Sequence, residues 1–171
     1  VNDLLMLARA DYGGMTVDLY PTDLDGVMVD VYHQGRALTQ GRELDLVMAQ
    51  VEPARINGNT DRLKQLLLNL LNNAVKFTPD GGKIEIGLRN EGTAAVVWVK
   101  DTGIGIDKEN LERIFDRFYQ IDDSRSLAHE GGGFGLWLSI ARWIVEAHGG
   151  TITAESGAER TTFTITLPAP L

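Results

Sequence analysis

The stretch "LLLNLLNNAVKFT", residues 66–78, is the most informative part of the sequence, because it places three asparagines within five positions of an otherwise apolar helical run. At 100° per residue, one side of such a helix is apolar and consists of Leu63, Leu67, Leu70, Leu71 and Ala74. The opposite side is polar and consists of Arg62, Gln65, Asn69, Asn72, Asn73 and Lys76. The pattern predicts a helix over residues 61–77 that ends before Pro79.

The polar stripe of this helix has two interpretations. It is either an ordinary solvated face, or a site to which Asn69, Asn73 and Lys76, spaced i, i+4 and i+7, all point. Asparagine costs up to about 0.7 kcal/mol relative to alanine in a helix, so a plain solvated face would use other residues more often. Amide oxygens beside an ammonium group suit Mg²⁺ together with a phosphate. The helix alone leaves both interpretations open.

A second signal is "KDTGIGIDKENLERIFDRF", residues 100–118. A strand ends here at Asp101, and Gly103 and Gly105 allow a flat ligand to approach the backbone closely. The carboxylate is placed to accept a hydrogen bond from an exocyclic amine. The triplet "DTG" is otherwise an ordinary turn or the catalytic triplet of an aspartic protease, but a protease needs two facing copies and this chain has one.

A third signal is "HEGGGFGLWLSIARWIVEAHGG", residues 129–150, in which glycines lead directly into an amphipathic helix over 134–148. Free amide groups at a helix N-terminus form an anion site, and a glycine run also serves as a hinge. No Gly-Lys-Ser/Thr follows, so this is not a Walker A loop.

The composition limits the possible partners. The chain has 171 residues, of which 43% are hydrophobic, which suffices for one sizeable core. Its formal net charge of −8 argues against a nucleic-acid partner. It has no cysteine, which excludes disulfides and thiolate metal sites. Its apolar stretches fall far short of the roughly 20 residues that span a bilayer, so we expect no direct membrane contact.

The remaining segments alternate irregularly between helix and strand signals. A helix is expected within residues 22–41, behind a possible cap at Asp23, and a short one over 111–118. Strands are expected over 44–50, 54–59, 83–90, 94–101, 151–156 and 161–168. This order predicts one mixed sheet with helices packed on it.

The order of the motifs "NLLNNAVKFT", "DTGIGI", "IFDRFYQID" and "GGGFGLWLSI" resembles the ATP-binding domain of sensor histidine kinases. These belong to the superfamily of gyrase, chaperone, histidine kinase and MutL proteins with the Bergerat fold. The resemblance covers roughly residues 20–171. It implies an α+β fold: a two-layer α/β sandwich in which a mixed, mostly antiparallel sheet packs on about three helices.

The resemblance implies ATP and Mg²⁺ as ligands and assigns the residues of the first motif. Asn73 would be the Mg²⁺ ligand, Asn69 would support it from one turn earlier, and Lys76 would meet phosphate oxygens. Asn73 and Lys76 would thus be the catalytic residues. Phe77 occupies the position at which the family often places an aromatic ring against adenine.

The later motifs are assigned in the same way. Asp101 would accept the adenine amine, Gly103 and Gly105 would shape the pocket, and Thr161 would help to hold adenine through water. Residues expected to anchor the lid and to surround the phosphates are Phe115, Phe118, Gly133, Phe134, Gly135 and Leu136.

The resemblance also implies a domain organisation. Residues 1–20 would be the end of the dimerisation-helix region with a linker, and residues 21–171 the catalytic domain with an ATP lid at about 119–133. None of His33, His129 and His148 lies in a phosphoacceptor context, so the acceptor histidine is expected on a separate dimerisation domain of the same parent protein. A response regulator would act downstream, and the domain would be cytoplasmic.

Two alternatives to a kinase remain. Trp137 stands where the family usually has a small residue, which favours a nucleotide-sensing or docking module with little or no phosphotransfer. The other alternative is an ATP-hydrolysing protein of the gyrase type. The phenylalanines of "IFDRFYQID" and the expected dimerisation helix are typical of kinases and disfavour it.

Overall fold

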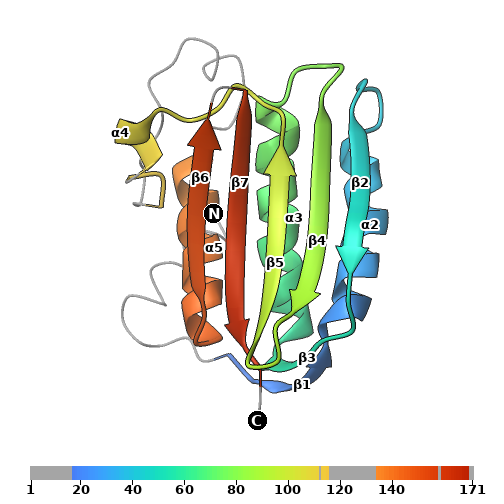
Figure 1. Cartoon of the computed structure of the whole chain (residues 1–171), viewed down its shortest axis with the longest axis vertical. Coiled ribbons are helices and arrows are strands. Elements are labelled where there is room, and N and C mark those ends of the chain that lie inside the picture. Colours follow the sequence, from blue (N-terminus) through green and yellow to red (C-terminus); the bar gives the residue numbers. More distant parts are fainter. Residues whose placement is uncertain (1–16, 112, 116–133, 158, 170–171) are drawn as a thin grey trace.

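A computed structural model describes residues 17–111, 113–115, 134–157 and 159–169, with only the backbone for residues 134–137. It has two layers, because the three long helices all lie against one face of the main sheet (Figure 1). The helices are α2 (Leu24–Leu38), α3 (Thr60–Phe77) and α5 (Phe134–Ala147). The α+β sandwich expected from the sequence is therefore confirmed.

The strands form a five-stranded sheet and a small two-stranded one. The strand order of the main sheet is β2-β4-β5-β7-β6, in which the pairing of β2 with β4 is parallel and the others are antiparallel. Its strands are β2 (Asp45–Val51), β4 (Lys83–Asn90), β5 (Ala94–Asp101), β6 (Thr151–Gly157) and β7 (Arg160–Pro168). The small sheet pairs β1 (Tyr20–Asp23) with β3 (Arg55–Gly58) in antiparallel register.

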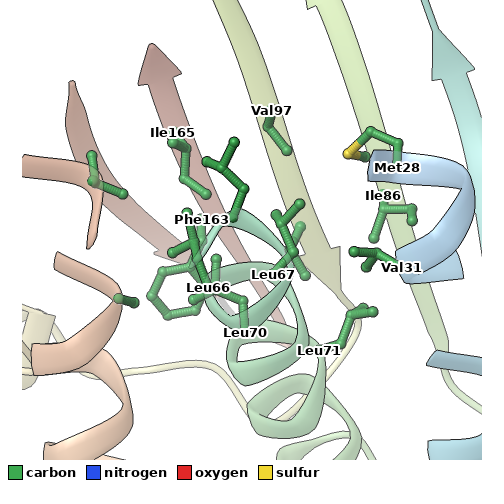
Figure 2. Close-up of a cluster of buried hydrophobic side chains, with 14 of the residues drawn as sticks. Met28, Val31, Leu66, Leu67, Leu70, Leu71, Ile86, Val97, Phe163 and Ile165 are labelled. Atoms are coloured by element: carbon green, nitrogen blue, oxygen red, sulfur yellow. The ribbon is translucent and has the colours of Figure 1, made fainter. Parts of the chain in front are cut away.

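The core lies between α3 and the inner face of the sheet. Figure 2 shows the α3 leucines among side chains from β4, β5, β7 and α2. Every second residue of β5 and β7 points into this layer, as the two-residue period of a strand requires. Five leucines of α3 are almost fully buried: Leu63, Leu66, Leu67, Leu70 and Leu71. The apolar face of α3 thus fixes this helix against the sheet, and with it the polar residues that the helix carries.

The ends of α3 follow from local sequence. Asn59 is the N-cap, and its side chain accepts a hydrogen bond from the backbone N–H of Arg62 at 3.1 Å. At the other end, Thr78 precedes Pro79 and is extended, with φ −103° and ψ 118°, because a residue before proline is disfavoured in the helical region. The helix therefore stops at Phe77, directly after Lys76.

Three expectations from the sequence were incomplete. Strand β1 was missed because Tyr20–Asp23 is too short to show a clear alternation of apolar and polar residues. Its backbone hydrogen bonds to β3, which lies more than 30 positions later, stabilise it as a strand. Asp23 occupies the N-cap position of α2 but makes no capping bond, since its carboxylate binds the Arg55 guanidinium at 3.0 Å instead. The short helix expected over 111–118 is α4 (Lys108–Leu111), three residues earlier, and residues 116–118 lie outside the described part.

A buried histidine joins the C-terminal end of α5 to the beginning of α3. His148 is 4% exposed; its Nδ1 lies 2.7 Å from the carbonyl of Ile144, and its Nε2 lies 3.0 Å from the backbone nitrogen of Asn59. The carbonyl only accepts and the amide only donates, so the ring is neutral with its proton on Nδ1. Burial lowers the pKa of His148 below its ordinary value of 6.5.

We expect this histidine to make the fold sensitive to acid. Because its folded-state pKa is lowered, its contribution to stability is complete above about pH 6.5 and is lost as the pH falls through the folded-state pKa. Urea unfolding at about pH 8 and about pH 5 checks this for the unaltered chain and for His148→Gln. The difference in unfolding free energy between the two proteins should shrink at the lower pH. An unchanged difference would contradict the prediction.

Candidate functional site

The residues singled out from the sequence gather at one end of the sandwich. The C-terminal ends of α3, β5 and β6, the beginning of β7 and the beginning of α5 all lie at this end (Figure 1). This follows from the topology, because β5 and β6 run parallel to α3 and antiparallel to β7 and α5. Segments as far apart in the sequence as Phe77 and Arg160 therefore contribute to one region.

Asp101 is the last residue of β5 and is 6% exposed. Oδ1 accepts a hydrogen bond from the backbone N–H of Gly103 at 2.8 Å. Desolvation by burial raises the pKa of Asp101 to about 6, although this hydrogen bond opposes the shift. A buried carboxyl group with a perturbed pKa and one uncommitted oxygen among the described residues is suited to accept a hydrogen bond from a ligand.

The two glycines after Asp101 are needed for close packing. A Cβ on Gly103 would lie 2.5 Å from the carbonyl oxygen of Phe77, the last residue of α3. Gly105 has φ +77°, and a Cβ there would lie 2.6 Å from the carbonyl oxygen of Gly157. The backbone N–H of Ile104 donates to the Phe77 carbonyl at 3.2 Å. Residues 102–106, which we call the glycine loop, therefore lie directly on the end of α3 and on the β6–β7 hairpin.

Thr161 is directly opposite Asp101 in the β5–β7 pairing and is 3% exposed. Its hydroxyl oxygen lies 3.0 Å from Oγ of Ser156. Ser156 Oγ also accepts a hydrogen bond from the backbone N–H of Ile106 at 2.7 Å and donates one to the carbonyl of Arg160 at 2.8 Å. The structure thus brings Thr161 beside Asp101 and adds Ser156, for which the sequence carries no signal.

Asn73 is 3% exposed, so the interpretation of this position as part of a solvated face is wrong. Helix α5 packs against α3, a contact between distant segments that the sequence alone does not show. Neither the amide nitrogen nor the amide oxygen of Asn73 has a hydrogen-bond partner within the described part of the chain. An orphaned buried amide costs about 1–3 kcal/mol and is expected chiefly where a function requires it.

The other residues of the first motif surround Asn73 on the last turns of α3. Asn69 and Lys76 are half-buried, and burial lowers the pKa of the Lys76 ammonium below its ordinary value. Phe77 is half-buried and packs against the core. The end of α3 therefore offers an amide, an ammonium group and an aromatic ring beside the glycine loop.

Ile114 and Phe115 are the described residues of the motif "IFDRFYQID", and Phe115 is the one expected to anchor the lid. Its ring packs edge-on against Phe163 of β7, with 6.2 Å between ring centroids, and its carbonyl accepts a hydrogen bond from Ser139 of α5 at 3.0 Å. Phe118, Gly133 and the expected lid lie outside the described residues. The backbone of Phe134, Gly135 and Leu136 forms the first turn of α5.

Arg42 holds the C-terminal end of α3 and was not singled out from the sequence. Its guanidinium donates to the carbonyl oxygens of Val75 and Thr78, at 3.0 Å and 2.7 Å, and forms an ion pair with Asp80. A helix leaves its last four carbonyls without intrahelical partners, and a cation there is favourable. A single arginine in the α2–β2 connection gives no sequence signal of this role.

Replacing Arg42 with alanine should lower the unfolding free energy by about 1–3 kcal/mol, because two carbonyls at the end of α3 lose charged donors. Arg42→Lys should recover only part of the lost unfolding free energy, because one ammonium group cannot donate to two carbonyls in the planar geometry of a guanidinium. Urea unfolding checks this, with Arg36→Ala, an exposed arginine in the last turn of α2, as the control. Equal losses for Arg42→Ala and Arg36→Ala would contradict the prediction.

Residues 58–171 match the family described as "Histidine kinase-, DNA gyrase B-, and HSP90-like ATPase". This match covers well over half of the sequence, and the chain belongs to this family. Within the family its relatives are sensor histidine kinases, and the fold is that of their ATPase catalytic domains.

The relatives give the extent of this likeness. The chain is 33% identical to "Sensor protein SrrB" of Staphylococcus aureus over 171 residues, which are 99% of this chain and 29% of SrrB. Full-length ShkA in complex with AMPPNP matches with a TM-score of 0.83 and 27% identity, covering 98% of this chain and 34% of ShkA. The mycobacterial sensor histidine kinase MprB matches with a TM-score of 0.75 and 26% identity, covering 89% of this chain and 100% of that structure.

Two findings bear on metal and membrane. Within the described ranges, no three His, Cys, Asp or Glu side chains cluster so as to hold a metal ion. None of the described helices combines the length and apolar character that a membrane-spanning helix needs.

Proposed function

We propose that this chain is the catalytic domain of a two-component sensor histidine kinase and transfers the γ-phosphoryl group of ATP to a histidine. The acceptor histidine lies on a separate dimerisation and phosphoacceptor domain, and a response regulator receives the phosphoryl group afterwards. One observation carries the proposal. Two buried polar side chains, the carboxyl group of Asp101 on β5 and the unpartnered amide of Asn73 on α3, lie at the same end of this family's fold.

The base end of the proposed site is built on the sheet. Asp101 accepts a hydrogen bond from the exocyclic amine of adenine, with Thr161 beside it and the glycine loop against the flat base. Phe77 lies at the adjoining end of α3, where its ring adds apolar contact. The binding of AMPPNP by ShkA supports a nucleotide at the corresponding place here.

The phosphate end is built on α3 and the beginning of α5. The orphaned amide of Asn73 fits a Mg²⁺ ligand, supported by Asn69, because Mg²⁺ takes few protein oxygens and completes its shell with phosphates and water. Bound there, Mg²⁺ would neutralise charge on the phosphates. Lys76 contacts phosphate oxygens, and the backbone amides at the beginning of α5, at Phe134, Gly135 and Leu136, face the anion.

The chemical step needs little from this domain beyond positioning and electrostatics. A neutral imidazole is already a nucleophile, so no general base from this chain is required. The nitrogen–phosphorus bond forms as the bond between the β–γ bridging oxygen and the γ-phosphorus breaks, and ADP leaves. Holding the two reactants in line, with charge compensated, supplies the rate enhancement.

The test has two stages. Calorimetric titration with ATP, with and without Mg²⁺, should show binding that depends on Mg²⁺. Incubation with γ-labelled ATP and a supplied dimerisation and phosphoacceptor domain should then yield acid-labile phosphohistidine on that domain.

The outcomes separate the kinase from its alternatives. Binding without transfer would contradict the proposal and favour a nucleotide-sensing or docking module. Steady ATP hydrolysis by the isolated domain, without an acceptor, would instead favour a gyrase-type ATPase. Asp45→Asn, an exposed carboxylate at the beginning of β2, is the control for nonspecific loss of binding.

A further inference from the structure

We propose that Ser156 is a positioning residue that turns the Thr161 hydroxyl into a pure hydrogen-bond acceptor, and that the site thereby prefers a 6-amino purine to a 6-oxo purine. This rests on the proposed function, since it concerns the base that the site receives. Neither the motifs nor the comparisons assign a role to Ser156.

The first step is the count of hydrogens around Ser156 Oγ. The backbone N–H of Ile106, at 2.7 Å, can only donate. The carbonyl oxygen of Arg160, at 2.8 Å, can only accept, and the carbonyl of Gly157 at 3.5 Å is more distant. A serine hydroxyl has one hydrogen and two lone pairs. Its hydrogen therefore goes to Arg160, and one lone pair is used by Ile106.

The second step gives the direction of the bond to Thr161. Its hydroxyl oxygen lies 3.0 Å from Ser156 Oγ, which has only a lone pair left to offer. Thr161 must therefore be the donor in this contact. Its single hydrogen is committed to Ser156, and only lone pairs remain for a ligand.

The third step concerns the neighbour of Thr161. Asp101 is its direct cross-strand partner, and both side chains are buried on the inner face of the sheet. When Asp101 is ionised, its carboxylate is also only an acceptor. This end of the site then has two acceptors side by side, which suit the two N–H groups of an exocyclic amine and repel a carbonyl oxygen.

Ser156 also holds the glycine loop in place, because its bond to Ile106 connects this loop to β6. If Ser156 only held the glycine loop, its loss would lower the affinity for all nucleotides equally. The selectivity between bases is what distinguishes the proposal from such a role.

The experiment compares the affinities of ATP and ITP, which differ at C6 by an amine against a carbonyl. In Ser156→Ala the Thr161 hydroxyl is free to donate, so the preference for ATP over ITP should narrow by roughly tenfold. In a Thr161→Val background, Ser156→Ala should leave the ratio unchanged. Thr153→Ala removes a hydroxyl from the exposed face of the same strand and is the matched control.

A measurement without nucleotide tests the hydrogen-bond arrangement directly. Amide hydrogen exchange at Ile106 should accelerate in Ser156→Ala and stay unchanged in Thr153→Ala. An unchanged ATP-to-ITP ratio in Ser156→Ala, with ATP still bound, would overturn the present inference alone. Absence of ATP binding by the unaltered chain would overturn the proposed function and the selectivity with it.

Discussion

Replacing Asn73 with leucine is expected to stabilise the fold while strongly weakening Mg²⁺-dependent ATP binding. The buried amide has two polar atoms without partners among the described residues, and leucine has a similar size and no polar atom. We expect the unfolding free energy to rise by about 1–3 kcal/mol. ATP affinity in the presence of Mg²⁺ should fall on the order of 100-fold, the equivalent of about 3 kcal/mol.

The control for this prediction lies one position away. Asn72→Leu makes the same chemical change at a half-buried residue of the same helix and should alter ATP affinity little. Urea unfolding and calorimetric titration of both variants provide the two readouts. If Asn73→Leu lowered the unfolding free energy, the amide would have a hydrogen-bond partner within the protein. The assignment of Asn73 as a Mg²⁺ ligand would then be contradicted.

Replacing Asp101 with asparagine is expected to have the second largest effect. Oδ1 accepts the Gly103 N–H, so an asparagine would keep its carbonyl oxygen there and place its amide nitrogen where the second carboxylate oxygen was. That nitrogen donates and would face the donating amine of adenine. Loss of a hydrogen bond to a charged group, at about 1.5–3 kcal/mol, predicts that ATP affinity falls roughly 10- to 150-fold.

The same substitution should stabilise the ligand-free chain near neutral pH. The folded-state pKa of Asp101 is raised from 3.8 to about 6, so the folded state binds this proton more tightly than the unfolded state. Its stability contribution is therefore greatest below pH 3.8 and is lost as the pH rises through about 6. An asparagine does not titrate and therefore avoids that loss. We expect Asp101→Asn to raise the unfolding free energy by about 1–3 kcal/mol at neutral pH and to leave it unchanged in acid.

Unfolding measurements above and below the pKa of Asp101 check this, with Asp45→Asn as the control. A stability gain that does not depend on pH would show that the carboxyl group is not the cause. Since His148 shifts stability in the opposite direction as the pH falls, each variant must be compared with the unaltered chain at the same pH.

Much of the fold could be predicted from the sequence, because strong local signals coincide with the real elements. The helix of the first motif, the β4–β5 hairpin and the last two strands have clear periodicity and clear stops. What could not be predicted depends on contacts between distant segments. Strand β1 exists through its pairing with β3, and no local signal marks the burial of Asn73 on the side of α3 that the sequence leaves polar.

The site shows the same division. Asp101 with its glycines follows from the motif "DTGIGI", and Thr161 follows from the family resemblance; the two lie close together in the structure. Ser156 and Arg42 act through hydrogen bonds to backbone groups 50 and 33 positions away, which no local pattern marks. The proposed roles of Phe118 and Gly133 stay predictions, as these residues lie outside the described part.

The guanidinium of Arg42 also changes the electric field at the end of α3. A helix carries roughly half a negative charge at its C-terminus, and α3 points that end toward the proposed phosphate region. Left alone, this field would repel a polyphosphate just where Lys76 is to attract it. The positive guanidinium of Arg42 donates to the carbonyls of Val75 and Thr78 and thereby offsets the negative charge at this end of the helix dipole. A residue outside the sequence motifs would thereby make it electrostatically possible for this helix end to receive the proposed anion.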